Sequence, residues 1–182
     1  MSQQMGLTTV RMRQKMDEGW FFHQGDIPIR YAVKGGMTGG LADITDAGMW
    51  PTTGYSEGHA DCPFSGQQWR EVDLPHDWCV EGEFDRCADA NHGYRPVGIG
   101  FYRKVFALPA EARGKRIWLE FDGVMRQSTV WVNGHLMGTH PSGYTSFYYD
   151  ISDVARCGED KDNVVLVRVD ASEFEGWWYE GC

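Results

Sequence analysis

The adjacent residues His76 and Asp77 form the most suggestive chemical pair in the sequence. A histidine beside a carboxylate can support acid–base catalysis. The pair lies in the segment Pro75-His76-Asp77-Trp78. Neighbouring residues of an extended chain point to opposite faces, so the two side chains are not expected to converge on one substrate atom. We therefore predict a structural role for this segment, with no catalytic residue in it.

A metal site is a second chemical possibility, in the segment that holds His59, Asp61 and Cys62. These donor types, at spacing i, i+2 and i+3, could ligate a metal ion. Three such donors in a glycine-rich loop more often occur together by chance. The sequence also has no Cys-x-x-Cys pair, which removes the common zinc motifs. We therefore predict no metal site and no cofactor.

Motifs of other enzyme classes do not occur in the sequence. There is no Gly-x-Ser-x-Gly elbow and no phosphate-binding loop. Glycoside hydrolysis needs two carboxylates. The chain has 26 acidic residues, but no pair of them sits in a recognisable glycosidase context. We therefore assign no catalytic residue in this chain.

Cys79 and Cys87 could form a disulfide in an oxidising compartment, and two free thiols are an equally good interpretation.

Charge and composition narrow the class of partner. The net charge is −9, and an acidic domain repels phosphate backbones, so we expect no nucleic-acid binding. The basic residues Arg11, Arg13 and Lys15 are more typical of a solvated tail. No run approaches the ~20 apolar residues of a membrane span. The N-terminus lacks the apolar core of a signal peptide, and the compartment, periplasmic or cytoplasmic, is not determined by the sequence.

Short strands are the elements that must position these groups. Alternation with a period of two marks 117–121, 129–132 and 165–169 as half-buried strands. Asn133-Gly134 suits a type I′ hairpin turn because both residues tolerate positive φ. Helical patterning is weak, with one possible turn at 153–156. Many short strands joined by glycine-rich turns predict an all-β antiparallel β-sandwich.

The predicted organisation is a single domain. Residues 1–16 are polar and are interpreted as a leader or an added tail, and residues 17–182 as one β-sandwich domain. Within it, 34–68 is interpreted as a long glycine-rich loop. A chain of 182 residues is too short for an eight-fold β/α barrel, which needs ~250 residues.

An ordered series of short motifs runs from Val72 to Asp170. Its pieces are Val72-Asp73-Leu74-Pro75-His76-Asp77-Trp78, Gly98-Ile99-Gly100-Phe101-Tyr102-Arg103, Leu119-Glu120-Phe121-Asp122-Gly123, Val130-Trp131-Val132-Asn133-Gly134, Gly143-Tyr144-Thr145-Ser146-Phe147 and Asn163-Val164-Val165-Leu166-Val167. The series resembles the N-terminal sugar-binding domain of glycoside hydrolase family 2, the family of β-galactosidases, β-glucuronidases and β-mannosidases. The resemblance implies a jelly roll similar to galactose-binding domains. It also implies catalytic glutamates on a later barrel that this chain does not contain.

The same resemblance points to sugar contacts near the C-terminus. Trp178-Tyr179-Glu180-Gly181-Cys182 is similar to the start of the family segment Trp-Tyr-x-Gly-x-Gly-Ile-Tyr-Arg. This implies that Glu175 and Trp178 bind substrate in the full-length protein. Glu173 is the alternative acidic residue. The alternative without a sugar contact is that the segment forms a solvated turn. Some family members place a sugar-binding Asn near the position of Val97, and its absence here argues against a lactose-type pocket. Tyr94 and Arg95 are alternative contacts.

Three functional hypotheses follow. The first is a non-catalytic domain of a family 2 glycosidase, which shapes the sugar pocket and docks on the catalytic barrel and a second sandwich domain. The alternative is a stand-alone carbohydrate-binding module, since fold does not determine function. The third is a domain that binds protein only. A fragment separated from its barrel would expose its docking surface and is expected to self-associate.

Overall fold

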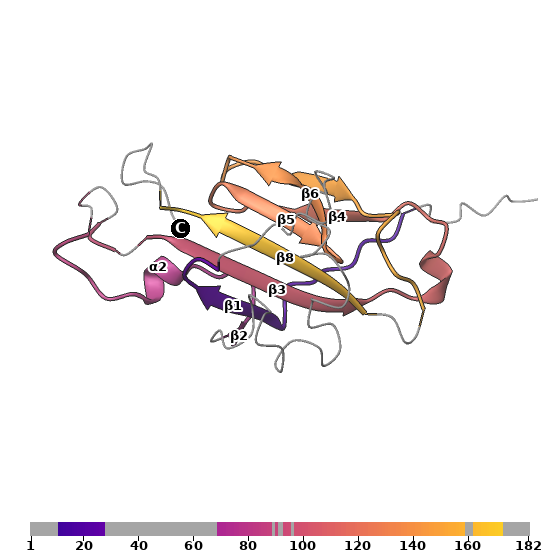
Figure 1. Ribbon diagram of the computed structural model, residues 1–182, viewed down its shortest axis with the longest axis horizontal. Coiled ribbons are helices and arrows are strands. Elements are labelled where there is room, and N and C mark those ends of the chain that lie inside the picture. The colour runs from indigo at the N-terminus through magenta and orange to yellow at the C-terminus, as the bar shows by residue number, and fades with distance from the viewer. Residues whose placement is uncertain are drawn as a thin grey trace, which may run out of the picture.

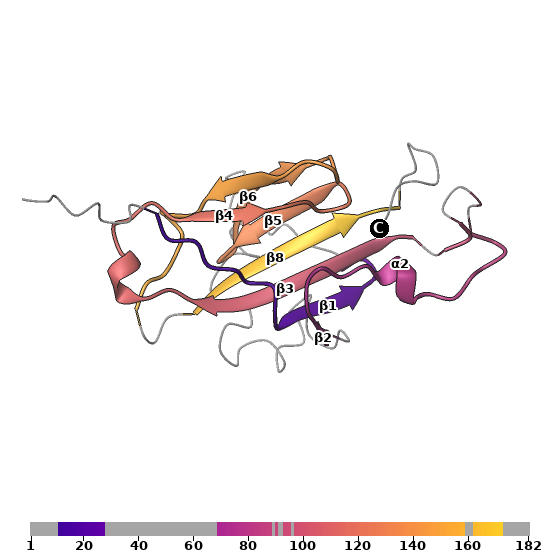
Figure 2. The same cartoon turned by 180° about the vertical axis from the view of Figure 1, so that it is seen from behind.

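The computed structural model describes residues 11–27, 69–88, 90, 93–95, 97–158 and 162–172. The predicted loop at 34–68 lies outside these residues. Two antiparallel sheets make up the described part of the chain (Figures 1 and 2). The larger sheet has the strand order β2-β1-β3-β8-β5-β6, and the smaller pairs β4 with β7. The predicted all-β antiparallel sandwich is confirmed.

The larger sheet consists of β1 (Trp20–Gln24), β2 (Arg70–Val72), β3 (Ile99–Ala107), β5 (Ser128–Val132), β6 (His135–His140) and β8 (Asp162–Asp170). The smaller sheet consists of β4 (Trp118–Phe121) and β7 (Phe147–Asp150). Two short helices were not predicted from the sequence, α2 (Trp78–Glu81) and the 3₁₀ helix η2 (Ala110–Ala112). Both are too short to show a helical period.

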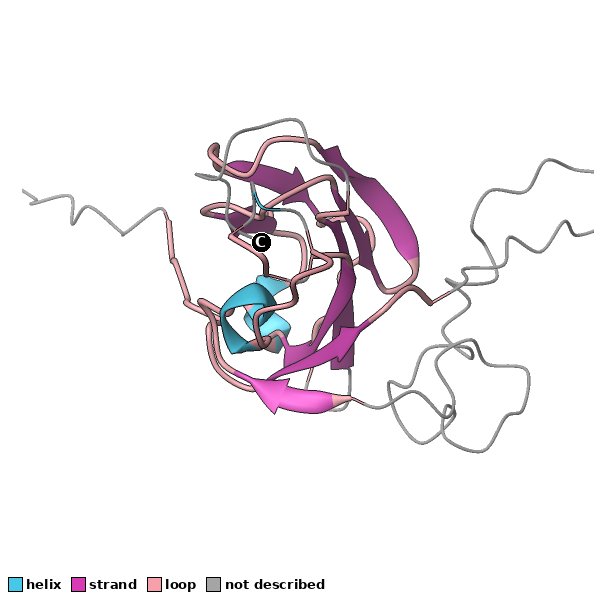
Figure 3. Cartoon of the chain, turned by 90° about the vertical axis from the view of Figure 1, so that its left-hand side faces the viewer, coloured by secondary structure: helices cyan, strands magenta, loops and turns pink. Residues whose placement is uncertain are grey.

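The long strands β3 and β8 set the length of the domain. They pair along their whole lengths, from Ile99 opposite Asp170 to Ala107 opposite Asp162. Nine residues at ~3.3 Å each give a ladder of roughly 30 Å. This ladder separates an end that carries α2, which faces the viewer in Figure 3, from an opposite end that carries η2. The two ends are therefore different surfaces of the molecule.

The main core lies between the two sheets. Its buried side chains include Trp20, Phe22, Tyr102, Leu119, Val130, Val132, Phe147, Ile151, Val165 and Val167. A second, smaller cluster lies on the other face of the large sheet and consists of Ile27, Phe101, Trp131, Val164 and Leu166. The prediction that β8 is half-buried was therefore wrong. As a central strand between β3 and β5, it is covered on its second face by Phe101 and Trp131.

The Asn133-Gly134 hairpin is confirmed. The two residues have φ of 47° and 87°, and they join β5 to β6. The Asn133 side chain also does something that the turn rule does not predict. Its amide donates to Val154 O and to Asn163 Oδ1, both at 2.8 Å, and its carbonyl accepts from Val164 N at 2.9 Å. The turn is thereby anchored to β8 and to the loop after β7.

The region predicted as a tail contacts the sandwich in its described part. Trp20 Nε1 donates to Met16 O at 2.5 Å, and the Met16 side chain packs against the main core. Arg13 forms an ion pair with Glu120 of β4 at 3.0 Å. Lys104 of β3 donates to Gly19 O at 3.3 Å. Residues 13–19 therefore follow the surface of the sandwich before β1 begins.

Candidate functional site

The end of the sandwich that carries α2 is the candidate functional site, because the C-terminal segment leaves the domain there. The backbone N–H of Ala171 donates to Gly98 O at 2.8 Å, and that of Asp170 donates to Arg126 O at 3.1 Å. These bonds place the exit from β8 beside the entry to β3. Glu175 and Trp178, the predicted sugar contacts, and the alternative Glu173 lie outside the described residues.

The exit from β8 is shaped by Asp170. Its carboxylate accepts from the Ser172 backbone N–H at 3.1 Å and from Arg168 Nη2 at 3.0 Å. Burial opposes ionisation of this carboxyl, but the bonds from Ser172 and the charge of Arg168 prevail and lower its pKa. Asp170 is therefore a carboxylate at neutral pH. It turns the chain away from the strand just before the predicted sugar contacts.

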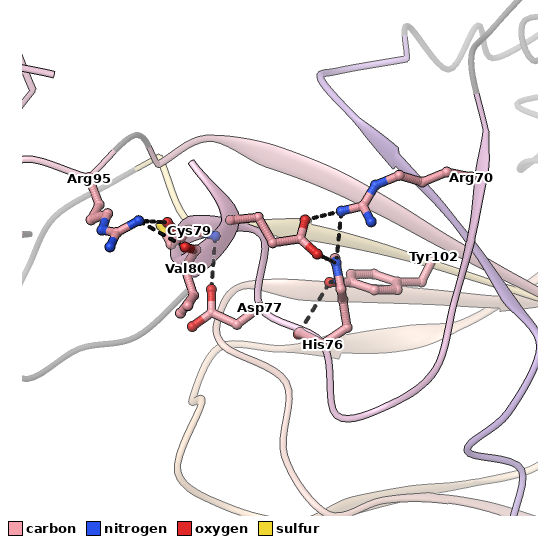
Figure 4. Close-up of polar contacts among 8 residues, drawn as sticks. Arg70, His76, Asp77, Cys79, Val80, Arg95 and Tyr102 are labelled. Atoms are coloured by element: carbon pink, nitrogen blue, oxygen red, sulfur yellow. Dashed lines mark hydrogen bonds and ion pairs between the residues drawn. The ribbon is translucent and has the colours of Figure 1, made fainter. Parts of the chain in front are cut away.

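The helix α2 is capped at both ends by side chains. Asp77 is its N-cap and accepts from the Cys79 backbone N–H at 2.9 Å. At the other end, the Arg95 guanidinium donates to Val80 O at 2.8 Å and also to Gly82 O (Figure 4). Arg95 also lies over the Phe84 ring, 4.2 Å from its centroid. These contacts, which are made through Nη1, show that Arg95 holds the C-terminal end of α2 in place.

His76 is a buried histidine at the centre of a polar network. Its ring is only 7% exposed, and Nδ1 lies 2.6 Å from the Tyr102 hydroxyl. Nε2 lies 3.0 Å from Arg70 Nη2 and 3.3 Å from Glu81 (Figure 4). Arg70 can only donate to Nε2 and the Glu81 carboxylate can only accept from it, so these two neighbours favour opposite tautomers of the ring. The Tyr102 hydroxyl can donate or accept, so its contact with Nδ1 is a hydrogen bond in either tautomer. Arg70 and Glu81 also form an ion pair.

The electrostatics of the network keep His76 neutral. Burial lowers the pKa of His76 below its ordinary value of 6.5; Glu81 raises it and Arg70 lowers it further. Burial, followed by the negative charge of Asp77, raises the pKa of Tyr102. A neutral imidazole and an un-ionised phenol are therefore the forms present at pH 7.

Aromatic rings surround the His76 and Tyr102 side chains, while Arg70 and Glu81 on the outer side of the network are about half exposed. The Phe22 ring centroid lies 4.7 Å from that of His76, 5.5 Å from that of Trp78 and 4.9 Å from that of Tyr102. Gly100 makes room for this cluster, because a Cβ there would come within 2.8 Å of the Phe22 ring. His76 points into this cluster whereas Asp77 caps α2. The arrangement fits the predicted structural role of Pro75-His76-Asp77-Trp78.

The surface of this end presents apolar side chains. Val80 is 67% exposed, Phe84 71% and Tyr94 48%. Tyr94 has φ of 61°, and its carbonyl accepts from the Asp85 backbone N–H at 2.8 Å, which closes the loop after α2. The loop is therefore tied to itself while its large side chains remain open to contact.

The sequence predicted part of this site. The structural segment was identified, but Arg70, Glu81 and Tyr102 were not assigned to it. Tyr102 lies 26 positions from His76 and on a different element. No local pattern links them, and only the pairing of β1 with β2 and β3 brings them together.

The structure tests the disulfide prediction but does not describe the residues of the possible metal site. His59, Asp61 and Cys62 lie outside the described residues; within the described ones, no three His, Cys, Asp or Glu side chains are grouped to hold a metal ion. Cys87 is an exposed free thiol, whereas Cys79 is disulfide-bonded. Neither the Cys79–Cys87 bridge nor the alternative of two free thiols is therefore correct. In the same described ranges, no helix is long and apolar enough to cross a membrane.

Residues 83–181 match the family model described as glycosyl hydrolases family 2, sugar binding domain. A β-galactosidase of Bacteroides ovatus is 42% identical over 122 residues, which are 65% of this chain and 14% of the relative. A β-glucuronidase of Bacteroides fragilis is 38% identical over 104 residues, which are 57% of this chain and 14% of the relative. The chain thus spans about a seventh of the length of these relatives.

Solved structures agree with this match. A glycosyl hydrolase family 2 member from Bacteroides cellulosilyticus superposes with a TM-score of 0.67 at 31% identity, over 92% of this chain and 19% of that one. A β-glycosidase from Bacteroides vulgatus gives a TM-score of 0.64 at 33% identity, over 91% of this chain and 18% of that one. The sandwich therefore corresponds to about a fifth of each larger chain.

Proposed function

The chain belongs to the sugar-binding domain family of glycoside hydrolase family 2, and we propose that it is the non-catalytic N-terminal domain of a multi-domain glycosidase that hydrolyses O-glycosidic bonds in carbohydrates. The observation that carries the proposal is the coverage. The chain spans 14% of a β-galactosidase to which it is 42% identical. The remaining length leaves room for a catalytic barrel with two glutamates and a retaining mechanism. In this proposal residues 17–182 form one sandwich domain.

The domain forms one wall of the sugar pocket through Glu175 and Trp178. A carboxylate accepts hydrogen bonds from sugar hydroxyls, and the face of an indole ring stacks on the C–H face of a pyranose. Support comes from the exit of β8, where Asp170 and Ala171 are fixed against Arg126 and Gly98. These bonds fix the position of the last described residues of the chain, 170–172, at the α2 end.

The same end docks on the catalytic barrel, while a second sandwich domain completes the parent protein. The exposed side chains of Val80, Phe84 and Tyr94 support this role, because exposed apolar groups mark interaction surfaces.

The docking surface can be tested on the isolated chain, because without the barrel two copies of the chain could bind each other through this surface. We expect sedimentation velocity to show self-association of the isolated chain, reduced by Phe84→Ser. A monomer at all concentrations would contradict the docking surface.

Steady-state kinetics of the parent glycosidase test the pocket role. Loss of a charge-assisted hydrogen bond or of ring stacking should lower kcat/KM by about 10- to 100-fold in Glu175→Gln and Trp178→Ala. Glu120→Gln is the control, since Glu120 lies on β4 and pairs with Arg13 at 3.0 Å. If Glu173→Gln alone lowers kcat/KM, the sugar contact belongs to Glu173. If none of the three variants changes it, the domain does not line the pocket.

A further inference from the structure

A cleft of about 350 Å³ lies at the end of the sandwich opposite α2, and Arg113, Lys115 and Arg156 line it. It opens between the turn after η2 and the loop after β7, at the end marked by the short coil between β3 and β4 in Figures 1 and 2. We propose that this cleft binds an oxyanion, either a sulfate or carboxylate group carried on a sugar or the free inorganic anion. The proposal does not depend on the function proposed for the α2 end.

The charge of the cleft is opposite to that of the chain. Three of its nine lining residues are basic and none is acidic, although the chain has 26 acidic and 17 basic residues. The nearby carboxylate of Asp150 is already engaged. It accepts from the Ser152 backbone N–H at 3.0 Å and pairs with Arg116 at 3.7 Å. The cleft is therefore a local positive site, which attracts anions despite the net charge of −9.

The fold holds one of the three cations by its side chain and a second by its backbone. Arg113 Nη2 donates to Cys157 O at 3.1 Å, which fixes one side of its guanidinium and leaves its other N–H groups. The backbone of Arg156 is fixed by Asn163, which is fully buried. The Arg156 N–H donates to Asn163 Oδ1 at 2.7 Å, and Asn163 Nδ2 donates to Arg156 O at 2.8 Å. Part of the cost of ordering the site, for the Arg113 side chain and the Arg156 backbone, is thus met by folding.

The chemistry of the lining selects the ligand class. Guanidinium groups present fixed forks of N–H donors that match carboxylate and sulfate oxygens. Ile117 supplies an apolar wall. The volume of about 350 Å³ falls within the ~300–1,000 Å³ of small-molecule sites and exceeds that of a single anion. An acidic group with its sugar ring fits this combination better than a lone ion.

NMR titration of the 182-residue chain tests the proposal. Sodium sulfate, sodium D-glucuronate and neutral methyl β-D-galactopyranoside are compared at constant ionic strength. We expect saturable amide shifts within 112–117 and 152–158 for the two anions, and none there for the galactoside. Lys115→Gln, at an exposed position, should weaken anion binding about 10-fold, and the double variant Arg113→Gln with Arg156→Gln by more. Arg86→Gln is the matched control, because it removes one exposed positive charge far from the lining and leaves the Arg116–Asp150 pair intact.

The source of the oxyanion follows from the order of affinity. Tighter binding of glucuronate than of sulfate assigns the site to a sugar-borne acid, and equal binding assigns it to the free anion. The proposal fails if neither anion gives saturable shifts in these residues. It also fails if Arg86→Gln weakens binding as much as Lys115→Gln does, because the effect would then come from the net charge of the chain and not from the cleft.

Discussion

The two ends of the sandwich are held by different kinds of polar side chain. At the α2 end, the anchors are His76, Tyr102, Arg70 and Glu81, which are all ionisable. At the η2 end, the anchors are the amides of Asn133 and Asn163, which do not titrate. At each end, side chains on or next to the large sheet bind a segment outside the sheet. Tyr102 bonds to His76 at the α2 end, and Asn163 bonds to Arg156 at the η2 end. The difference predicts a pH-sensitive end and a pH-insensitive one.

The amide end should be the more costly to disturb. Asn163 is fully buried and bonds to both backbone groups of Arg156 and to Asn133. Asn163→Ala leaves several buried groups without partners and should lower the free energy of unfolding by about 3–5 kcal/mol. Urea denaturation measures this. Thr139→Ala, on the exposed side of β6, is the control, and an equal loss in both variants would show that the amide pair is not an anchor.

Tyr102→Phe removes the hydroxyl that hydrogen-bonds to His76 Nδ1 and tests the other end. The buried Nδ1 then lacks its partner, so we expect a loss of about 1–3 kcal/mol in the free energy of unfolding. Tyr148→Phe is the matched control, because Tyr148 is 64% exposed on β7. The network has no stabilising role if the two variants are equally stable.

Arg95→Gln should have a smaller and local effect. It removes the guanidinium that caps α2 and stacks on Phe84, a change of about 1 kcal/mol. Amide hydrogen exchange should become faster in 79–82 and stay unchanged in β8. Arg86→Gln, an exposed position in the same loop, controls for charge. Uniform acceleration across the domain would mean that Arg95 supports the fold as a whole.

The smallest expected effect is the pH dependence of stability, which should arise at the α2 end and not at the η2 end. The folded protein lowers the pKa of His76 below 6.5, so the unfolded chain binds a proton more readily. The stability contribution is complete above pH 6.5 and is lost as pH falls below it. We expect the urea midpoint to fall between pH 8 and pH 5.5, and His76→Gln to flatten the curve. An unchanged slope in His76→Gln would assign the dependence to other groups.

The two carboxylates with lowered pKa values, Asp150 and Asp170, do not contribute in this pH range. The pKa of Asp150 is lowered mainly by hydrogen bonds from Ser152, and that of Asp170 by Ser172 and Arg168 against the effect of burial. Groups with depressed pKa stabilise the fold above their ordinary value of 3.8 and lose this contribution only as pH falls below it. The comparison with His76→Gln therefore separates the contribution of His76 from that of the other titrating groups.

The sequence predicted features whose signal is local. The hairpin at Asn133-Gly134 follows from two adjacent residues that tolerate positive φ. The alternation at 117–121 predicted the buried Leu119 and exposed Glu120 of β4. The sandwich and its family followed from a series of such motifs. These features need no knowledge of distant contacts.

Features set by tertiary contacts could not be predicted in this way. Asn163 meets Asn133 across 30 positions, and His76 meets Tyr102 across 26. The burial of Leu166 depends on Phe101 and Trp131 from neighbouring strands. The cationic cleft joins residues near 113 with residues near 156. In each case the sequence contains the chemical groups, but strand pairing determines which of them meet.

Titration of the isolated chain with methyl β-D-galactopyranoside and other neutral glycosides tests the proposed role most directly. A domain that forms only one wall of a pocket should show no saturable binding at glycoside concentrations up to ~10 mM. A dissociation constant above ~10 mM corresponds to a binding free energy of less than about 3 kcal/mol. A dissociation constant of ~0.1 mM or tighter, with amide shifts around Gly98 and Ala171, would contradict this account. The chain would then be a self-sufficient carbohydrate-binding module.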